Sequence, residues 1–101
     1  MEPSFIYEAK GRTLVIHLPR ELDHHNCRNL KYETDLLMAE NYISRILFDF
    51  TGTEFMDSSG IGVIIGRSRK MGYFGGEVYA EHLSGRILKI FKVSGLHTLI
   101  R

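Results

Sequence analysis

The chain has 101 residues, enough for one domain but too few for two separate hydrophobic cores. Hydrophobic residues make up 44% of it and charged residues 25%, which excludes a disordered tail. Thirteen basic and twelve acidic residues give a formal net charge of +1, whereas a nucleic-acid-binding domain of this size is usually far more basic. We therefore expect one globular domain over residues 1–101 that does not bind nucleic acid directly.

The cysteine content and the chain start favour a cytoplasmic protein. The single cysteine, Cys27, cannot form a disulfide within the chain, which favours a reducing compartment. Residues 1–12 carry four charged side chains and lack the apolar segment of a signal peptide. The purest apolar stretch, residues 61–66, is too short to cross a bilayer, so we expect no membrane partner.

Charge is divided unevenly along the chain. Residues 1–50 hold six basic and eight acidic side chains, whereas residues 51–101 hold seven basic and four acidic ones. This division indicates a region of positive potential on the C-terminal half. A solvated polar face is the simpler interpretation of the same charges.

The first predicted element is a β-hairpin. Residues 4–9 are rich in aromatic and branched side chains, and residues 13–18 alternate between apolar and polar. Gly11 and Arg12 lie between the two segments and are typical of a tight turn. Pro19 ends the second strand because it has no N–H for a sheet hydrogen bond.

An amphipathic helix and a buried strand follow. Asp23 lies where a helix N-cap is expected. About four helical turns after it carry an apolar stripe at spacings of three and four residues, formed by Cys27, Leu30, Thr34 and Leu37. Residues 45–50 are apolar on both faces apart from Asp49 and the leading Arg45, which predicts a central strand covered on both sides.

A loop over residues 51–57 precedes a second helix, which begins near Ser58 and stops at Gly72. The predicted buried stripe of this helix comprises Ile61, Ile64, Ile65 and Ser68. Its predicted polar side carries Arg67, Arg69 and Lys70.

The last elements complete a βαβ pattern. Residues 76–80 form a short strand, and Ser84 caps a third helix that buries Ile87, Leu88 and Phe91. Residues 94–95 end this helix, and residues 96–100 form a last short strand. The order predicts an α/β fold with a mixed sheet of four to five strands, parallel inner strands and helices packed against it.

The most unusual segment, residues 55–62 (Phe-Met-Asp-Ser-Ser-Gly-Ile-Gly), follows the central strand and opens a helix. Helix N-termini offer free N–H donors, and ligands favour this end of a parallel sheet. The simplest interpretation is that Asp57, Ser58 or Ser59 caps the helix. However, Gly60, Gly62 and Gly66 each cost about 1 kcal/mol relative to Ala. This cost indicates a close approach, by the sheet beneath or by a partner above.

Four runs together resemble a known family. They are residues 21–25 (Glu-Leu-Asp-His-His), residues 55–67, residues 75–77 and residues 91–96 (Phe-Lys-Val-Ser-Gly-Leu). In order and spacing they closely resemble the anti-sigma factor antagonists of the STAS-domain family, nearest to the sporulation members directed at sigma F. The resemblance covers almost the whole chain and implies a single STAS domain.

The resemblance implies partner switching. An anti-sigma factor that is also a serine kinase holds the sigma factor silent, and the unphosphorylated antagonist binds that kinase and displaces sigma. The kinase then phosphorylates the antagonist, which is released, and a metal-dependent, PP2C-type phosphatase resets it. By motif, the phosphorylated residue is Ser58. ATP and Mg²⁺ belong to the kinase, so the chain itself is expected to need no cofactor.

The same resemblance assigns partner-binding residues. Those beside Ser58 are Asp57, Ser59, Gly60 and Gly62, and those in the Glu-Leu-Asp loop are Asp23 and His24. Gly62 lies opposite Ile64 on the helix and is expected on the exposed docking face. An expected consequence is that Gly62→Asp lowers binding more than stability.

The chain departs from the family pattern at three points. Relatives commonly continue beyond the position of Arg101, Arg20 replaces a usual glycine, and Thr34 puts a hydroxyl on an apolar stripe. The chain could also be a paralogue that serves a different kinase or sigma factor. A second interpretation is a STAS module that senses a small molecule or nucleotide without serine phosphorylation.

A small enzyme is the weakest interpretation. His24, His25 and Cys27 do not make the four ligands that zinc usually takes, and neighbouring His residues on a helix diverge. Cys27 falls on the buried stripe, which favours a structural role. The residue two before Ser58 is Met56, so the nucleophile motif of a serine hydrolase is missing. We expect no catalytic residue and no metal ligand.

Overall fold

The predicted hairpin opens the fold. In the computed structural model, which describes residues 5–101, β1 (Ile6–Lys10) pairs antiparallel with β2 (Thr13–His17). Gly11 occupies the turn with a φ of 62°, a conformation that glycine adopts without steric cost. The predicted first strand starts at residue 4, which lies outside the described residues.

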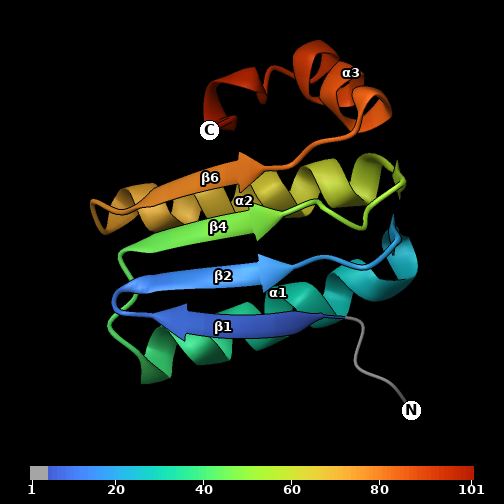
Figure 1. The fold of residues 1–101 in the computed structure, drawn as a ribbon. Coiled ribbons are helices and arrows are strands. Elements are labelled where there is room, and N and C mark those ends of the chain that lie inside the picture. The colour runs from blue at the N-terminus through green and yellow to red at the C-terminus, as the bar shows by residue number, and fades with distance from the viewer. Residues whose placement is uncertain (1–4) are drawn as a thin grey trace.

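The main sheet has four strands in the order β1-β2-β4-β6, with β4 at Arg45–Asp49 and β6 at Glu77–Glu81. The pairs β2–β4 and β4–β6 are parallel, which confirms a mixed sheet with parallel inner strands. Helix α1 (His24–Glu40) connects β2 to β4, and α2 (Ser58–Tyr73) connects β4 to β6. Since successive strands are added in one direction, crossovers of one hand place both helices on the same face (Figure 1).

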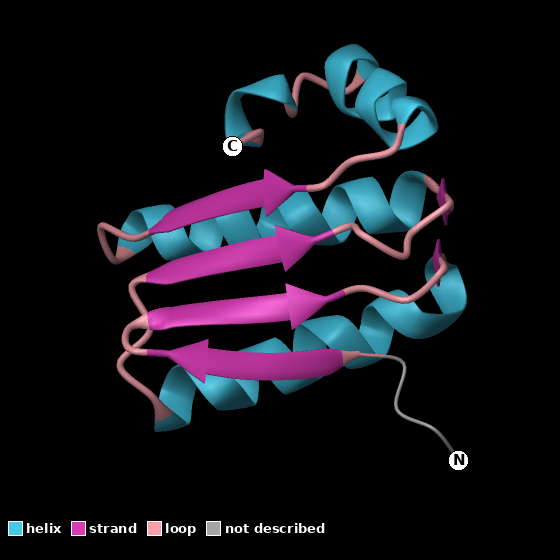
Figure 2. Cartoon of the chain, viewed as in Figure 1, coloured by secondary structure: helices cyan, strands magenta, loops and turns pink. Residues whose placement is uncertain are grey.

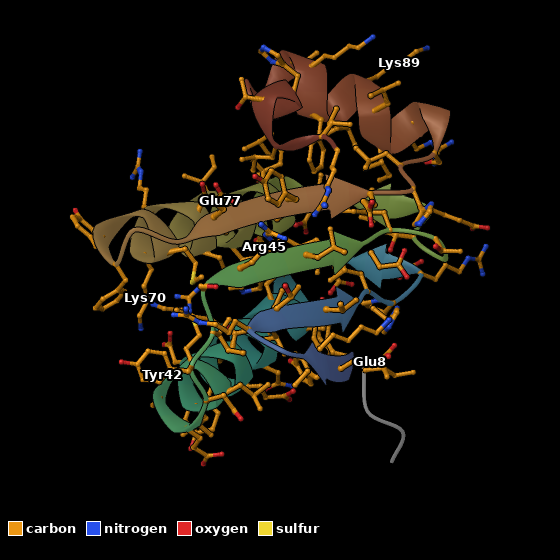
Figure 3. All side chains as sticks on the ribbon, turned by 60° about the vertical axis from the view of Figure 1, so that its left-hand side comes forward. Glu8, Tyr42, Arg45, Lys70, Glu77 and Lys89 are labelled. Atoms are coloured by element: carbon orange, nitrogen blue, oxygen red, sulfur yellow. The ribbon has the colours of Figure 1, made fainter. Side chains whose placement is uncertain are left out.

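The prediction that residues 45–50 are covered on both faces is wrong. Ile46 and Phe48 of β4 are fully buried beneath the helices, but Arg45, Leu47 and Asp49 on the other face are not. Neither α1 nor α2 reaches that face, where Arg45 pairs with Glu77 of β6 at 3.5 Å (Figure 3). The sheet is therefore covered by these two helices on one side only.

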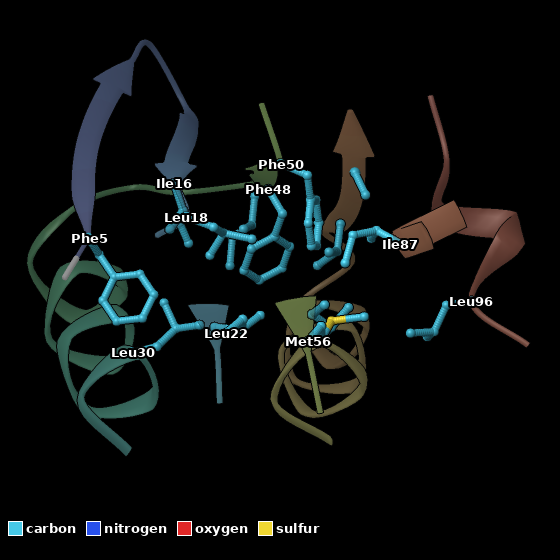
Figure 4. Close-up of a cluster of buried hydrophobic side chains, with 14 of the residues drawn as sticks. Phe5, Ile16, Leu18, Leu22, Leu30, Phe48, Phe50, Met56, Ile87 and Leu96 are labelled. Carbon is cyan, nitrogen blue, oxygen red and sulfur yellow. The ribbon is translucent and has the colours of Figure 1, made fainter. Parts of the chain in front are cut away.

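The core lies between the sheet and the two helices (Figure 4). Its fully buried side chains include Ile16, Leu30, Phe48, Phe50 and Ile64. Helix α3 (Gly85–Val93) packs at the β6 edge of the sheet and buries Ile87 and Phe91, as predicted, whereas Leu88 is only half-buried. The Phe91 ring meets Phe50 edge-on, with ring centroids 5.3 Å apart.

The predicted last strand over residues 96–100 is wrong. Residues His97–Leu99 form a 3₁₀ helix, η1, in which Leu99 N–H donates to Leu96 O at 3.0 Å. Gly95 has a φ of 76°, and Leu96 N–H bonds back to Phe91 O, so the chain turns tightly after α3. The chain meets β6 at Ile100, which forms a parallel bridge with Ala80, and at Arg101, whose N–H donates to Ala80 O at 2.9 Å.

The buried faces of the helices agree with the sequence for α1 but not for α2. Cys27, Leu30 and Thr34 are buried as predicted. The buried residues of α2 are Gly60, Ile64, Arg67 and Met71, whereas Ile61, Ile65 and Ser68 are half-buried. Arg67 is only 4% exposed, so its prediction as a polar-side residue is wrong. The reason is its hydrogen bonds to α1, where Asp35 and Thr34 accept from its guanidinium.

Among residues 5–101, no helix is long and apolar enough to cross a membrane.

Candidate functional site at the starts of α1 and α2

A second, two-stranded sheet brings the starts of α1 and α2 together. β3 (Glu21–Leu22) pairs parallel with β5 (Phe55–Met56), and Asp57 N–H donates to Leu22 O at 3.2 Å. Figure 2 shows these two short strands at the end of the molecule where both helices begin. The Glu-Leu-Asp loop and the Asp-Ser-Ser-Gly motif, 34 residues apart in this register, therefore lie side by side.

One carboxylate caps one helix and contacts the other. Asp57 is the N-cap of α2, and its Oδ1 accepts from Ser59 N–H at 2.8 Å and Gly60 N–H at 3.2 Å. Its Oδ2 accepts a hydrogen bond of 3.1 Å from the backbone N–H of His24, which is the first residue of α1. Asp57, rather than either serine, is thus the cap, and it also fixes the distance between the two helix starts.

Asp23 caps α1, as the sequence predicts. Its Oδ1 accepts from Asn26 N–H at 3.2 Å, and Asn26 Oδ1 accepts from Asp23 N–H at 3.1 Å. Such a reciprocal capping box satisfies N–H groups that the first helical turn leaves free. A structural role therefore accounts for Asp23, which remains half-exposed beside the site.

The two serines of the motif are not equivalent. Ser58 is the first residue of α2 and is exposed, and within residues 5–101 its hydroxyl forms no hydrogen bond. Ser59 is half-buried, and its Oγ lies 3.4 Å from Nδ1 of His24. Ser58 is therefore the hydroxyl that a macromolecule can reach.

The glycines of α2 fall into two groups. A Cβ on Gly60 would lie 2.6 Å from Cγ of Met56 and 2.9 Å from the Leu22 carbonyl oxygen. Gly60 is buried, so the small sheet beneath explains why it is glycine, and it does not share the exposed surface of its neighbours. Gly62 is exposed, with no atom within 4 Å of a Cβ placed there.

A groove of about 320 Å³ runs between the two helices from this point. From α1 it is lined by His24, Cys27, Arg28 and Lys31, and from α2 by Ser59, Gly62, Val63, Gly66 and Arg67. It thus contains three of the predicted partner-binding residues, His24, Ser59 and Gly62. The sequence prediction singled out Gly66 as a possible point of close approach but missed Arg28 and Lys31. Residues 24, 28 and 31 are separated by four and then three positions, which puts them on one helix face.

Burial of the Cys27 thiol in the groove disfavours its ionisation. Burial, reinforced by the charges of Asp57 and Asp23, raises the pKa of Cys27 to about 11. The thiol therefore stays protonated at neutral pH and lacks the thiolate needed for nucleophilic attack. This agrees with the structural role predicted from the position of Cys27 on the apolar stripe.

Arg67 closes one side of the groove through an ion pair with α1. Its guanidinium donates to Asp35, which also accepts from Lys70 Nζ at 2.7 Å. Burial acts to raise the pKa of Asp35, but the hydrogen bonds and charges of Lys70 and Arg67 prevail and hold it below its usual value. Asp35 thus stays ionised and compensates the buried charge of Arg67.

Comparison with known proteins identifies the fold family, since residues 4–101 match the STAS domain. The chain belongs to the STAS domain family. This STAS domain is 33% identical over 84 residues to the anti-sigma F factor antagonist of Lysinibacillus sphaericus, covering 83% of the chain and 72% of that relative.

Two solved structures match this STAS domain closely. The anti-sigma factor antagonist SpoIIAA in its unphosphorylated form superposes with a TM-score of 0.89 at 32% identity, covering 96% of this chain and 85% of that one. The Bacillus cell fate determinant SpoIIAA in the phosphorylated form gives a TM-score of 0.80 at 32% identity, covering 96% and 88%. The family and the α/β fold predicted from the sequence are confirmed.

Proposed function

We propose that this STAS domain is an anti-sigma factor antagonist that binds an anti-sigma factor with serine kinase activity. Phosphorylation of Ser58 by that kinase then ends the binding between the two proteins. The L. sphaericus relative is an anti-sigma F factor antagonist, and the matching SpoIIAA structures comprise an unphosphorylated and a phosphorylated form. Both support a phosphorylation switch in this chain.

The accessibility of Ser58 carries the proposal. Its hydroxyl is exposed at the start of α2, while the neighbouring Ser59 is half-buried with its Oγ 3.4 Å from His24. A kinase that approaches the helix start therefore meets Ser58 first. The proposed contact surface comprises Asp23, His24, Asp57, Ser59 and Gly62, which lie at or near the adjoining starts of α1 and α2.

A phosphate on Ser58 adds a charge of up to about −2. The nearest capping donors, the N–H groups of Ser59 and Gly60, already bond to the Asp57 carboxylate. The phosphate thus stands beside a carboxylate without those donors, and a bound partner must desolvate it at a high cost. Binding is lost by charge and desolvation, and no change of fold is required.

The chemistry of the switch belongs to the partners. The kinase supplies ATP and Mg²⁺, a PP2C-type phosphatase removes the phosphate, and this chain contributes the acceptor hydroxyl and no catalytic residue. Since sigma factors act with RNA polymerase, the proposal places the domain in the cytoplasm.

Intact mass after incubation with the cognate kinase and Mg²⁺-ATP tests the modification. We expect the wild-type chain and the matched Ser59→Ala variant to gain one phosphate, and Ser58→Ala to gain none. A phosphate on Ser58→Ala, or an unmodified wild-type chain, would contradict the proposal.

A further inference from the structure

We propose that the groove between α1 and α2 receives an acidic side chain of the anti-sigma partner, and that Arg28 and Lys31 are the cations that bind it. This inference rests on the proposed function and assigns a partner chemistry to a surface beyond the phosphorylation motif.

Two glycines keep the groove open, although the packing of the chain itself does not require glycine at either position. Gly62 and Gly66 lie one helical turn apart on the wall that α2 contributes. A Cβ at either position would have no atom within 4 Å, in contrast to the crowded position of Gly60. Glycine weakens a helix relative to alanine, so internal packing does not explain these two residues. A partner side chain that occupies the space above Gly62 and Gly66 would account for the absence of a side chain at both positions.

The charges around the groove are of one sign. Its lining includes three cationic side chains, Arg28, Lys31 and Arg67, and no carboxylate. Arg67 is compensated by Asp35, whereas Arg28 and Lys31 are exposed and form no ion pair with any residue of the described 5–101 segment. These unpaired cations attract a carboxylate and repel a basic side chain.

The floor of the groove makes such a pairing effective. Cys27 is buried, Val63 is half-buried, and the two glycines expose no polar side chain. A carboxylate that enters between these groups leaves bulk water, and its attraction to Arg28 and Lys31 is less screened than on an open surface. The volume of about 320 Å³ fits one or two side chains, not a folded element.

Charge reversal with a matched control tests the proposal. The test variant is Arg28→Glu with Lys31→Glu, and the control is Lys89→Glu with Lys92→Glu. The control changes the same charge at the same spacing of three residues, at two exposed positions of α3, of which Figure 3 labels Lys89. Affinity for the cognate anti-sigma factor is measured by titration calorimetry at low and high salt, and thermal unfolding verifies that both variants fold.

We expect the groove variant to bind about tenfold or more weakly, with a smaller salt dependence than the wild type, and the control to bind within about twofold of it. Equal affinity of the groove variant and the wild type overturns the groove assignment but leaves the proposed function intact. A wild-type chain that does not bind the anti-sigma factor overturns both. A third titration uses ATP alone and tests whether the groove is instead a nucleotide site. If the wild type binds ATP, the groove variant does not, and both have the same affinity for the anti-sigma factor, the assignment of a protein side chain to the groove is overturned.

Discussion

At the residue scale, Gly60 and Gly66 show that glycines of one helix serve different purposes. Gly60 lets α2 approach the Leu22 carbonyl and Met56, whereas Gly66 borders the open groove. The same substitution at the two positions should therefore change stability in opposite directions.

We expect Gly60→Ala to lower the free energy of unfolding by about 1–3 kcal/mol, because the added methyl overlaps backbone and core atoms. Gly66→Ala should raise it by up to about 1 kcal/mol, because alanine favours the helix and meets no atom within 4 Å. Urea unfolding of the two variants measures both effects. Equal destabilisation by the two substitutions would show that the two glycines do not differ in this way.

The sequence predicted individual site residues where a local rule applies. Asp23 was predicted as an N-cap, and Asp57 was among three candidates, because capping depends on the few residues that follow. Arg67 was assigned to the polar side because charged residues are rarely buried without a partner. Its partner, Asp35, lies 32 residues earlier in the chain, and no local pattern indicates that contact.

At the element scale, the two helix starts are brought together by strands that sequence periodicity cannot reveal. β3 and β5 have two residues each, too few to show an alternating pattern. The longer elements β2, α1 and β6 were predicted because each extends over enough residues to show a period. The last strand was predicted wrongly because the apolar residues of the 3₁₀ helix that follows Gly95 have a sequence pattern like that of a short strand.

A charged cluster joins three strands on the face of the sheet away from α1 and α2. His17 of β2 bonds through Nδ1 to Asp49 of β4 at 2.7 Å and through Nε2 to Glu8 of β1. Lys10 lies 3.8 Å from Glu8, and Thr51 Oγ1 donates to Asp49 at 2.6 Å. The hydrogen bonds to Glu8 and then to Asp49 raise the pKa of His17 above its usual value of 6.5.

A raised pKa means that folding favours the protonated imidazole. The stabilisation is complete below the unfolded-state pKa and is lost as the pH rises from 6.5 through the higher pKa of the folded state. We expect the free energy of unfolding to fall over this range in the wild type. His17→Asn, which cannot take up the proton, should have a flatter profile in urea unfolding at several pH values. The same slope in both proteins would contradict this role of His17.

At the scale of the whole molecule, the groove combines cations from both halves of the chain. The groove takes Arg28 and Lys31 from the more acidic half of the sequence and Arg67 from the more basic half. Helix packing, not chain order, thus determines where cations gather. The net charge of +1 becomes about −1 when one phosphate is added, so a single modification reverses the sign of the net charge.

The proposed switch requires that phosphorylation of Ser58 alone abolishes binding. The most direct measurement compares the affinity of the cognate anti-sigma factor for the unmodified chain and for the same chain carrying one phosphate on Ser58, purified from a single kinase reaction. We expect the phosphorylated chain to bind at least about a hundredfold more weakly, because a bound partner must desolvate a dianion that lies beside the Asp57 carboxylate. Equal affinities of the two forms would contradict the switch.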